Sequence, residues 1–282
     1  MPVRMIESKQ NARLKQLRRA LAGPGRGAIG RAGRELVGIE GPNLVAEALR
    51  SGIKLDTVFV AQGSEGLLDS LPLAPETEIF LLPGKLLFPA LSTETPQAIA
   101  ALIEQPAWAW ADMLGAQTGR APLVVILAGL QDPGNLGTIL RSSEAFGATG
   151  IVSLPGTVNE WNSKAVRASA GSVFRVPVVS ATANGCFAQL RKAGFNIWTT
   201  ALNHAEPADR VDLALPSAIL IGNEGNGVPA EMAAKADGAL MIPCPGPVES
   251  LNASVAASVL LYEASRQRSA LVHGGAAARK PR

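Results

Sequence analysis

The sequence contains little of the chemistry on which many enzymes depend. Only two cysteines and two histidines occur among its 282 residues, and they stand apart from one another, at Cys186, Cys244, His204 and His273. This spacing fits no metal site, no disulfide framework and no histidine-based triad, so we expect no metal ion. Each cysteine is expected to be a small buried apolar residue rather than a nucleophile.

Long hydrophobic runs are also lacking. The apolar run at residues 123–130 is far shorter than the roughly 20 residues that cross a bilayer. The charged N-terminus is not followed by the apolar segment of a secretory signal. The sequence therefore predicts a cytoplasmic protein with no membrane partner, and its length suggests about two domains.

Acidic residues are scarce at the N-terminus, and aromatic residues are scarce throughout. The first 34 residues carry nine lysines and arginines against the single acid Glu7, and the C-terminus adds Arg266, Arg268, Arg279, Lys280 and Arg282. Such clusters suit a phosphate backbone, because binding it releases counterions. A solvated basic tail without a partner is the alternative. With only 4% aromatic residues, recognition of bases by aromatic stacking is not indicated.

The order of apolar and polar residues predicts two α/β regions. Residues 5–22 are expected to form a basic helix and residues 23–33 a mobile, glycine-rich arm. Residues 34–105 form a small α/β unit, with a helix from Pro42 to before Gly52, a helical turn at 84–91, and strands at 55–61, 78–82 and 98–103. Residues 105–119 connect this unit to the second region.

From residue 122 onward, apolar strands alternate with helices, which predicts a parallel sheet covered on both faces. The expected strands are 123–128, 150–154, 195–200, 218–221 and 239–242. The expected helices are 136–146, 163–170, 185–192, 229–235 and 250–265. Ligands of such sheets bind beyond the carboxyl ends of the strands. Three loops follow predicted strands there, at residues 129–137, 221–229 and 241–252.

The third of these loops, at residues 241–252, contains three prolines and leads into a helix. Ser250 or Asn252 is expected to cap that helix. Leu251, Val255, Val259 and Tyr262 recur at near-helical spacing, so we expect them to form a buried face. Polar groups at a helix N-terminus can hold a charged ligand, although a plain strand, turn and core helix is the alternative.

The first loop, 129–137, leads into a helix that carries Arg141. Asn135 could cap this helix or bind a ribose or phosphate oxygen, and Arg141 could grip a phosphate or simply lie on the surface. The second loop, 221–229, has three glycines that allow close backbone approach to a ligand, but it matches neither the dinucleotide fingerprint nor the P-loop. Glu224 in this loop is either functional or a turn acid. The three loops together suit the orientation of two substrates more than covalent catalysis.

Three ordered motifs in these loops resemble those of a known enzyme family. They are Asp-Pro-Gly-Asn-Leu-Gly-Thr-Ile-Leu-Arg at 132–141, Gly-Asn-Glu-Gly-Asn-Gly-Val at 222–228, and Ile-Pro at 242–243 with Glu-Ser-Leu-Asn-Ala-Ser-Val-Ala at 249–256. Residues 122–265 thus resemble the SpoU/TrmH family of S-adenosylmethionine-dependent RNA ribose 2′-O-methyltransferases, within the SPOUT superfamily. Residues 38–52 and 91–97 resemble the N-terminal substrate-binding domain of its rRNA members.

The resemblance implies a fold and a domain plan. The fold class is α/β: a C-terminal parallel-sheet SPOUT domain with a trefoil knot formed by the second and third loops, and a small N-terminal α/β RNA-binding domain. We expect a basic helix and flexible arm (1–33), an RNA substrate-binding domain (34–106), a linker (107–121), the SPOUT methyltransferase domain (122–268) and a basic tail (269–282). A homodimer whose active site draws residues from both subunits is also implied.

The resemblance further assigns site residues. Those expected to bind S-adenosyl-L-methionine are Thr200, Ala201, Leu202, Gly222, Asn223, Gly227, Ile242, Leu251 and Asn252. Those expected at the catalytic centre are Asn135, Arg141, Glu224, Ser250 and Asn252. Ala253 replaces the valine that often follows this asparagine in the family, a change that should not disturb the chemistry.

The implied reaction is in-line attack of a ribose 2′-oxygen on the methyl carbon of a sulfonium, without a metal or a covalent intermediate. The hydroxyl needs a base or a site that stabilises developing alkoxide. Arg141 is the base in the family's proposal, but a guanidinium gives up a proton with difficulty, so a cationic clamp on phosphate is equally open. Glu224 would fix Arg141 or the knot. The RNA is expected to be 23S-type rRNA. A tRNA methyltransferase, an antibiotic-resistance rRNA methylase or a non-catalytic RNA-binding protein are the alternatives.

Overall fold

The computed structural model describes residues 3–30, 33–115, 120–248 and 250–277, with the side chains up to residue 269. The chain forms two compact units: Met1–Ala107 with Asn159–Arg175, and Trp108–Val158 with Val176–Arg282. Parts of three predicted features lie outside the described residues, namely Arg31 of the basic arm, 116–119 of the linker and 278–282 of the tail. Glu249 of the third motif lies outside them as well.

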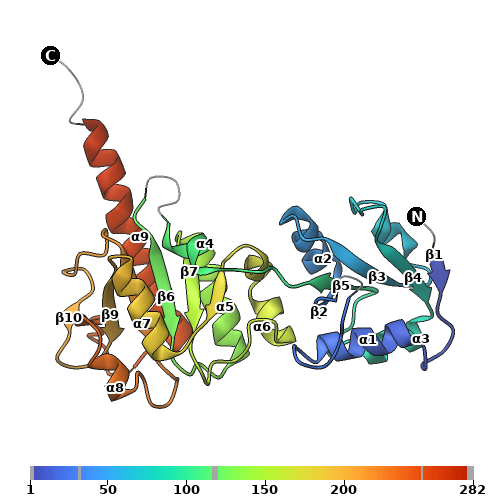
Figure 1. The fold of residues 1–282 in the computed structure, drawn as a ribbon, viewed down its shortest axis with the longest axis horizontal. Helices are drawn as coiled ribbons and strands as arrows, with labels where there is room; N and C mark the ends of the chain where they lie inside the picture. The colour runs from blue at the N-terminus through green and yellow to red at the C-terminus, as the bar shows by residue number, and fades with distance from the viewer. Residues whose placement is uncertain (1–2, 31–32, 116–119, 249, 278–282) are drawn as a thin grey trace. The chain divides into compact units, whose positions relative to one another are not determined.

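The first unit is built on a five-stranded mixed sheet in the order β1-β4-β3-β5-β2 (Figure 1). The strands are β1 (Val3–Met5), β2 (Leu36–Glu40), β3 (Leu55–Ala61), β4 (Glu78–Leu82) and β5 (Ile99–Glu104). Its helices are α1 (Ala12–Leu21), α2 (Pro42–Arg50) and α3 (Gly84–Leu87), with short 3-10 turns η1 (Glu65–Leu68) and η2 (Phe88–Ala90). Phe59 and Phe80 stack at 5.8 Å in its core. The strands at 55–61 and 78–82, the helix from Pro42 and the turn at 84–91 are confirmed, and β2 was not predicted.

The predicted helix at residues 5–22 is wrong in its first half. Val3–Met5 instead pairs in parallel with β4, and α1 begins only after Asn11, whose side chain accepts the amide hydrogens of Arg13 and Leu14. Leu14 and Leu17 are fully buried against the sheet. The glycine-rich segment that follows is not a free arm up to residue 30, because Ala28 lies in the same core and its carbonyl accepts the amide of Leu36.

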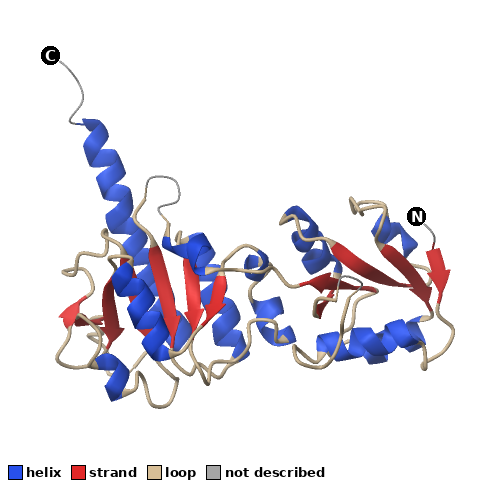
Figure 2. Cartoon of the chain, in the orientation of Figure 1, coloured by secondary structure: helices blue, strands red, loops and turns tan. Residues whose placement is uncertain are grey.

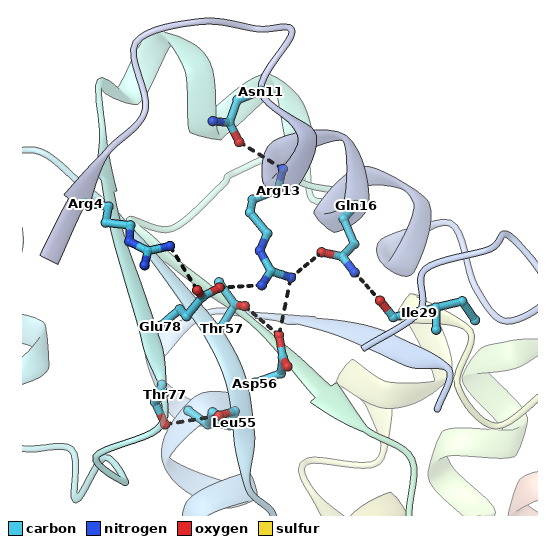
Figure 3. Close-up of polar contacts among 10 residues, drawn as sticks. All are labelled: Arg4, Asn11, Arg13, Gln16, Ile29, Leu55, Asp56, Thr57, Thr77 and Glu78. Carbon is cyan, nitrogen blue, oxygen red and sulfur yellow. Dashed lines mark hydrogen bonds and ion pairs between the residues drawn. The ribbon is translucent and has the colours of Figure 1, made fainter. Parts of the chain in front are cut away.

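Two of the N-terminal arginines belong to an internal network (Figure 3). Arg13 contacts Glu78 of β4 and lies 3.7 Å from Asp56, while Arg4 binds the other oxygen of Glu78 at 3.1 Å. Arg13 also donates to Gln16, whose amide in turn donates to the carbonyl of Ile29. The guanidinium of Arg13 thus fastens α1 to the first residues of β3 and β4 rather than facing solvent.

The first unit also contains a segment from much later in the chain, residues 159–175. It carries α6 (Ser163–Ala168) and the 3-10 turn η3 (Ser172–Phe174). Arg167 donates to Glu40 at 2.8 Å, and Arg175 donates to Glu47 at 2.9 Å. A β-carbon on Gly171 would lie 2.9 Å from that of Glu47, so the segment packs closely against α2.

The second unit contains a seven-stranded sheet in which every pairing is parallel, in the order β10-β12-β9-β11-β6-β7-β8. Figure 2 draws its strands in red and its helices in blue. The strands are β6 (Leu123–Leu127), β7 (Gly150–Ser153), β8 (Val178–Ser180), β9 (Asn196–Thr200), β10 (Glu206–Pro207), β11 (Ser217–Ile221) and β12 (Gly238–Met241). The helices are α4 (Trp110–Leu114), α5 (Pro133–Ala145), α7 (Ala183–Lys192), α8 (Ala230–Ala233) and α9 (Ala253–Ala277). The α/β class and the five predicted strands are confirmed. The short β8 and β10, and α4 within the predicted connection, were missed.

The last helix, α9, lies beside α5 (Figure 1). Ser142 and Ser258 share a hydrogen bond of 2.6 Å between these helices, and the rings of Phe146 and Tyr262 meet edge to face at 5.7 Å. The predicted buried face of α9 is wrong, since Val255, Val259 and Tyr262 are 47%, 39% and 56% exposed. The buried side carries Ala257, Leu260, Leu261 and Ala264 instead. Among the described residues, no helix combines the length and apolarity needed to cross a membrane.

Candidate functional site

The second unit has a cavity of about 850 Å³ at the carboxyl ends of β9, β11 and β12. Parallel strands end at the same edge of a sheet, which brings the loops that follow them together. Its walls come from the segments 200–203, 221–227, 240–242 and 250–253, and from Cys244, Val248, Ala256 and Leu260. Every residue predicted to bind the cofactor lines this cavity. Of the predicted catalytic residues, Glu224, Ser250 and Asn252 line it, whereas Asn135 and Arg141 do not.

The glycine loop after β11 is closed on itself so tightly that one glycine is obligatory. The amide of Asn223 donates to the carbonyl of Gly227 at 3.0 Å, and the amide of Gly227 returns the bond at 2.9 Å. A β-carbon on Gly222 would lie 2.0 Å from the carbonyl carbon of Gly227. No side chain fits there, so the wall of the cavity at this point is bare backbone.

The side chain of Asn223 holds this loop against the first loop. Its amide nitrogen donates to the carbonyl of Gly129 at 2.8 Å, and its oxygen accepts the amide of Gly225 at 2.9 Å. The side chain of Asn223 thus stabilises the turn of its own loop and fixes that loop to the first loop. Asn223 is therefore used structurally within the unit, although it lines the cavity.

Glu224 joins the first and second loops. Its carboxylate accepts the amides of Gln131 and Asp132 at 3.2 and 3.1 Å, and the side-chain amide of Asn135 at 3.0 Å. Partial burial raises the pKa of Glu224, but the hydrogen bond from Asn135 and those from the backbone amides outweigh it and lower the pKa below its ordinary value. The carboxylate therefore stays ionised at the edge of the cavity.

Asp132 caps helix α5, which leaves the side chain of Asn135 free to bind Glu224. The Asp132 carboxylate accepts the amide of Asn135 at 2.9 Å, so Asp132, and not Asn135, caps α5. Arg141, farther along α5, is exposed. In the part of the chain that the structure describes, its guanidinium makes no hydrogen bond or ion pair, so the expected contact of Glu224 with Arg141 is not found.

Asn252 caps α9. Its side-chain oxygen accepts the amides of Ser254 and Val255 at 2.9 and 3.4 Å and the hydroxyl of Ser254 at 2.7 Å. Of the two candidate caps, Asn252 is therefore the one used, and the helix begins at Ala253. Ser250 is exposed. The oxygen of Asn252 is taken up by the cap, which leaves its side-chain NH₂ to face a ligand.

Several cavity residues were not predicted. Asn203, Met241, Cys244 and Val248 line the cavity between the predicted positions, and their place in the same loops is the only signal that could have found them. Cys244 is exposed, so the expectation of a buried thiol is wrong there. It is right for Cys186, where burial raises the pKa of the thiol to about 12. Among the described residues, no three His, Cys, Asp or Glu side chains come together as a metal site would require.

Comparison with known proteins gives consistent matches. Residues 122–262 match the model of the SpoU rRNA Methylase family. A 23S rRNA (guanosine(2553)-2′-O)-methyltransferase of Bacillus subtilis is 34% identical over 226 residues, which cover 79% of this chain and 86% of the relative.

Solved structures agree over nearly the whole chain. The SpoU methyltransferase AviRb from Streptomyces viridochromogenes, in complex with the cofactor AdoMet, superposes with a TM-score of 0.77 at 29% identity, covering 92% of this chain and 99% of that one. An AdoMet-bound rRNA methyltransferase from Sinorhizobium meliloti gives a TM-score of 0.78 at 28% identity, covering 94% of this chain and 98% of that one. The similarity thus includes both units.

Proposed function

Because this chain belongs to the SpoU rRNA methylase family, we propose that it transfers a methyl group from S-adenosylmethionine to a ribose 2′-oxygen of large-subunit ribosomal RNA. The observation that carries this proposal is the cavity of the second unit, where the three motif-bearing loops meet or are tied together by Glu224 and Asn223. The protein is then a soluble, cytoplasmic RNA methyltransferase.

The cavity fits S-adenosylmethionine in size and chemistry. About 850 Å³ lies within the range of ligand pockets, roughly 300–1,000 Å³. Apolar walls at Leu240, Ile242 and Leu251 alternate with backbone amides and carbonyls of the glycine loop. The ionised Glu224 at its edge favours a cationic ligand. When bound, the cofactor supplies a methyl group activated by its positively charged sulfur.

The residues of this chain divide the work of binding and orienting. Gly222, Ile242 and Leu251 offer backbone contacts to the donor, with residues 200–202 along its adenine. The side-chain NH₂ of Asn252, the Ser250 hydroxyl and the one N–H of Asn135 that Glu224 does not accept orient the ribose. Glu224 acts as a positioning residue, because it holds the amides of the first loop and the side chain of Asn135.

Arg141 is proposed to clamp a phosphate of the RNA. Its guanidinium is exposed and, within the described residues, no acid occupies it, so both edges are available for a bidentate phosphate contact. A cation there also favours the developing alkoxide.

The clamp is tested by single-turnover methylation with Arg141→Lys and Arg141→Ala, using Arg210→Ala, another exposed arginine of the same unit, as control. We expect a loss of about 10²-fold or more for Arg141→Ala and a partial loss for Arg141→Lys, with S-adenosylmethionine affinity unchanged. Full turnover by Arg141→Lys would exclude a bidentate clamp and a base role alike.

The substrate class is tested by mapping 2′-O-methyl groups in total RNA from cells with and without the protein. A single missing methyl group in large-subunit rRNA supports the proposal, and one in tRNA would replace it with tRNA methylation. Calorimetry with S-adenosylmethionine tests the enzyme itself, since an absence of binding would leave only a non-catalytic RNA-binding role.

We further propose a homodimer that buries the exposed side of α9 and completes each site with residues of the other subunit. Val255, Val259 and Tyr262 form an apolar strip there that water would otherwise cover. Light scattering should show that Val259→Asp with Tyr262→Asp converts the dimer to a monomer. The control, Leu215→Asp, changes another exposed apolar residue and should leave the dimer intact. Monomeric wild-type protein would contradict the proposal.

We also propose a trefoil knot in the second unit. Of the five-part domain plan we propose the division into an RNA-binding unit and a methyltransferase unit, with residues 3–30 and 159–175 counted in the first. The knot would be formed by the loops 221–229 and 241–252, and its support is that these loops share one cavity and that β12 and β11 flank β9 in the sheet. Joining the two chain ends covalently would trap a knot in the unfolded chain. In denaturant, a knotted cyclic chain should stay more compact than an unknotted cyclic chain of the same length, and equal dimensions would contradict the knot.

A further inference from the structure

The first unit contains a second pocket, of about 480 Å³, which the methyl-transfer reaction does not use. It lies where α2 begins, between that helix, the loop 92–97 and α6. Its lining residues are Glu40, Gly41, Asn43, Leu44, Glu47, Arg50, Thr93, Thr95, Gln97, Arg167 and Ala170. Its volume falls within the range of small-ligand pockets.

A buried carboxylate fixes the shape of this pocket. Glu40 is 6% exposed and accepts three hydrogen bonds, from the amide of Ser92 at 2.9 Å, from the Ser92 hydroxyl at 2.8 Å and from Arg167 at 2.8 Å. Arg167 also donates to the Ser92 hydroxyl at 2.8 Å. The end of β2, the start of the loop and α6 are thereby held together, so the pocket is preorganised.

The pocket offers neutral polar side chains that other protein groups do not occupy. In the described part of the chain, Asn43, Thr93, Thr95 and Gln97 make no side-chain hydrogen bond to another residue, and all but Thr93 are exposed. Each of them carries both a donor and an acceptor. Gly41, with φ of +90°, lets Gln97 come close, since a β-carbon there would lie 2.9 Å from the Gln97 side-chain oxygen.

The charged residues that line the pocket are paired with one another. Arg167 is bound to Glu40, and Arg50 to Glu47, which also accepts a hydrogen bond from Arg175 outside the lining. An anion would therefore meet two carboxylates together with the two guanidiniums, which disfavours phosphate. What remains available is a set of amide and hydroxyl groups beside two planar guanidinium faces.

We propose that this pocket receives an unstacked nucleobase of the RNA substrate. Asparagine and glutamine amides match the paired donor and acceptor groups on base edges, and RNA is read mainly through splayed bases that stack on aromatic or guanidinium planes. The pocket contains no aromatic residue, so Arg50 or Arg167 supplies the stacking face. The inference rests on the proposed function, and it adds a site that selects sequence at a single base.

Binding of a transcribed large-subunit rRNA fragment to the full-length protein tests the proposal. The variant is Asn43→Ala with Gln97→Ala, and the matched control is Gln10→Ala with Gln62→Ala, which removes two exposed amides of the same unit outside the pocket. Two lost neutral hydrogen bonds predict a roughly 10- to 100-fold higher Kd for the pocket variant. The control, the S-adenosylmethionine affinity and the melting temperature should match wild type.

Salt dependence separates a base from a phosphate. If the pocket holds a base, the slope of log Kd against log salt is the same in wild type and in the pocket variant, whereas loss of a phosphate contact lowers it by about 1. A changed slope overturns the proposal, and so does a pocket variant that binds as wild type does. In the latter case RNA binding and methylation persist, and the proposed function stands. Wild-type protein that binds no RNA overturns both.

Photo-cross-linking locates the base directly. With the same fragment transcribed with 4-thiouridine and 6-thioguanosine, cross-links should map to the peptides that carry residues 41–50 or 92–97 and should weaken in the pocket variant. Cross-links confined to other peptides would overturn the proposal.

Discussion

Each unit has a carboxylate that ties a loop to a strand end, but the two are built differently. Glu40 is buried and shares its charge with Arg167. Glu224 lies at the cavity edge and accepts from the amides of Gln131 and Asp132 and from Asn135, without a cation among the described residues. A buried charge needs a counter-charge, whereas an exposed carboxylate can be stabilised by amides alone.

The difference suits the two tasks. The compensated acid of the first unit leaves a neutral pocket, fit for a base. The uncompensated acid of the second unit leaves a negative edge, fit for a sulfonium. The same arrangement, a carboxylate that accepts amides of a neighbouring loop, thus produces opposite electrostatic environments in the two units.

The largest effect is expected where the second unit has no freedom at all. Gly222→Ala places a β-carbon 2.0 Å from backbone, so the loop that Glu224 belongs to must open, and S-adenosylmethionine affinity in calorimetry should fall by about 100-fold or more. Gly225→Ala is the control, since its nearest contact would be 3.5 Å, and it should bind nearly as wild type. Equal affinities of the two variants would show that the loop is not rigid.

The next effect concerns the compensated acid. Glu40→Ala leaves Arg167 and Ser92 without their acceptor. We expect the free energy of unfolding, measured with denaturant, to be about 1–3 kcal/mol lower than in wild type. Arg34→Ala is the control. It breaks an exposed ion pair with Glu104 at 3.4 Å and should lower the free energy of unfolding by at most about 1 kcal/mol. Equal losses in the two variants would show that burial of Glu40 does not increase its contribution to stability.

A smaller, pH-dependent effect is expected for the uncompensated acid. The pKa of Glu224 is lower in the folded protein than in the unfolded chain, so its stabilisation is present above the ordinary glutamate pKa and is lost as pH falls through the lowered one. Glu224→Gln should therefore melt slightly below wild type at pH 7, and the two melting temperatures should converge as the pH falls through the lowered pKa of Glu224. A constant difference over this range would contradict the assigned hydrogen bonds.

The smallest effects sharpen the same contrast among cations of the first unit. Arg13 is held by Glu78 and lies close to Asp56. Arg13→Ala should therefore lower the melting temperature and leave unchanged the slope of log Kd for RNA against log salt. Lys15 is exposed on α1, and Lys15→Ala should do the reverse, lowering the slope by about 1 if it contacts phosphate. Identical behaviour of the two variants would show that internal pairing does not decide which basic residues bind RNA.

The sequence predicted the fold where local patterns decide it. β6 is a continuous apolar run, β11 is apolar after its first serine, and both are buried along their whole length in the sheet. β9 and β12 are only partly buried and were predicted from shorter apolar stretches. Residues 3–5 failed because their partner in β4 is remote in sequence. Val255 and Val259 failed because α9 is apolar on two sides, and periodicity does not say which side the sheet covers.

The site was predicted as a set of residues but not as a set of contacts. The second and third motifs identified residues that line the cavity. The first motif contributes no lining residue, and the bond that ties its Asn135 to Glu224 joins positions 89 residues apart. The same holds for the second pocket, since Arg167 was not a predicted site residue and meets Glu40 across 127 residues of chain. Contacts of this kind depend on topology and have no local signal.

The late segment 159–175 has a consequence for synthesis on the ribosome. Residues 1–107 leave the exit tunnel well before Arg167 is made, so the nascent first unit must pass through a stage in which Glu40 lacks its cation. A fragment ending at residue 107 would be trapped at that stage for good. The first unit is therefore expected to reach its final stability only after the chain has entered the second unit and returned.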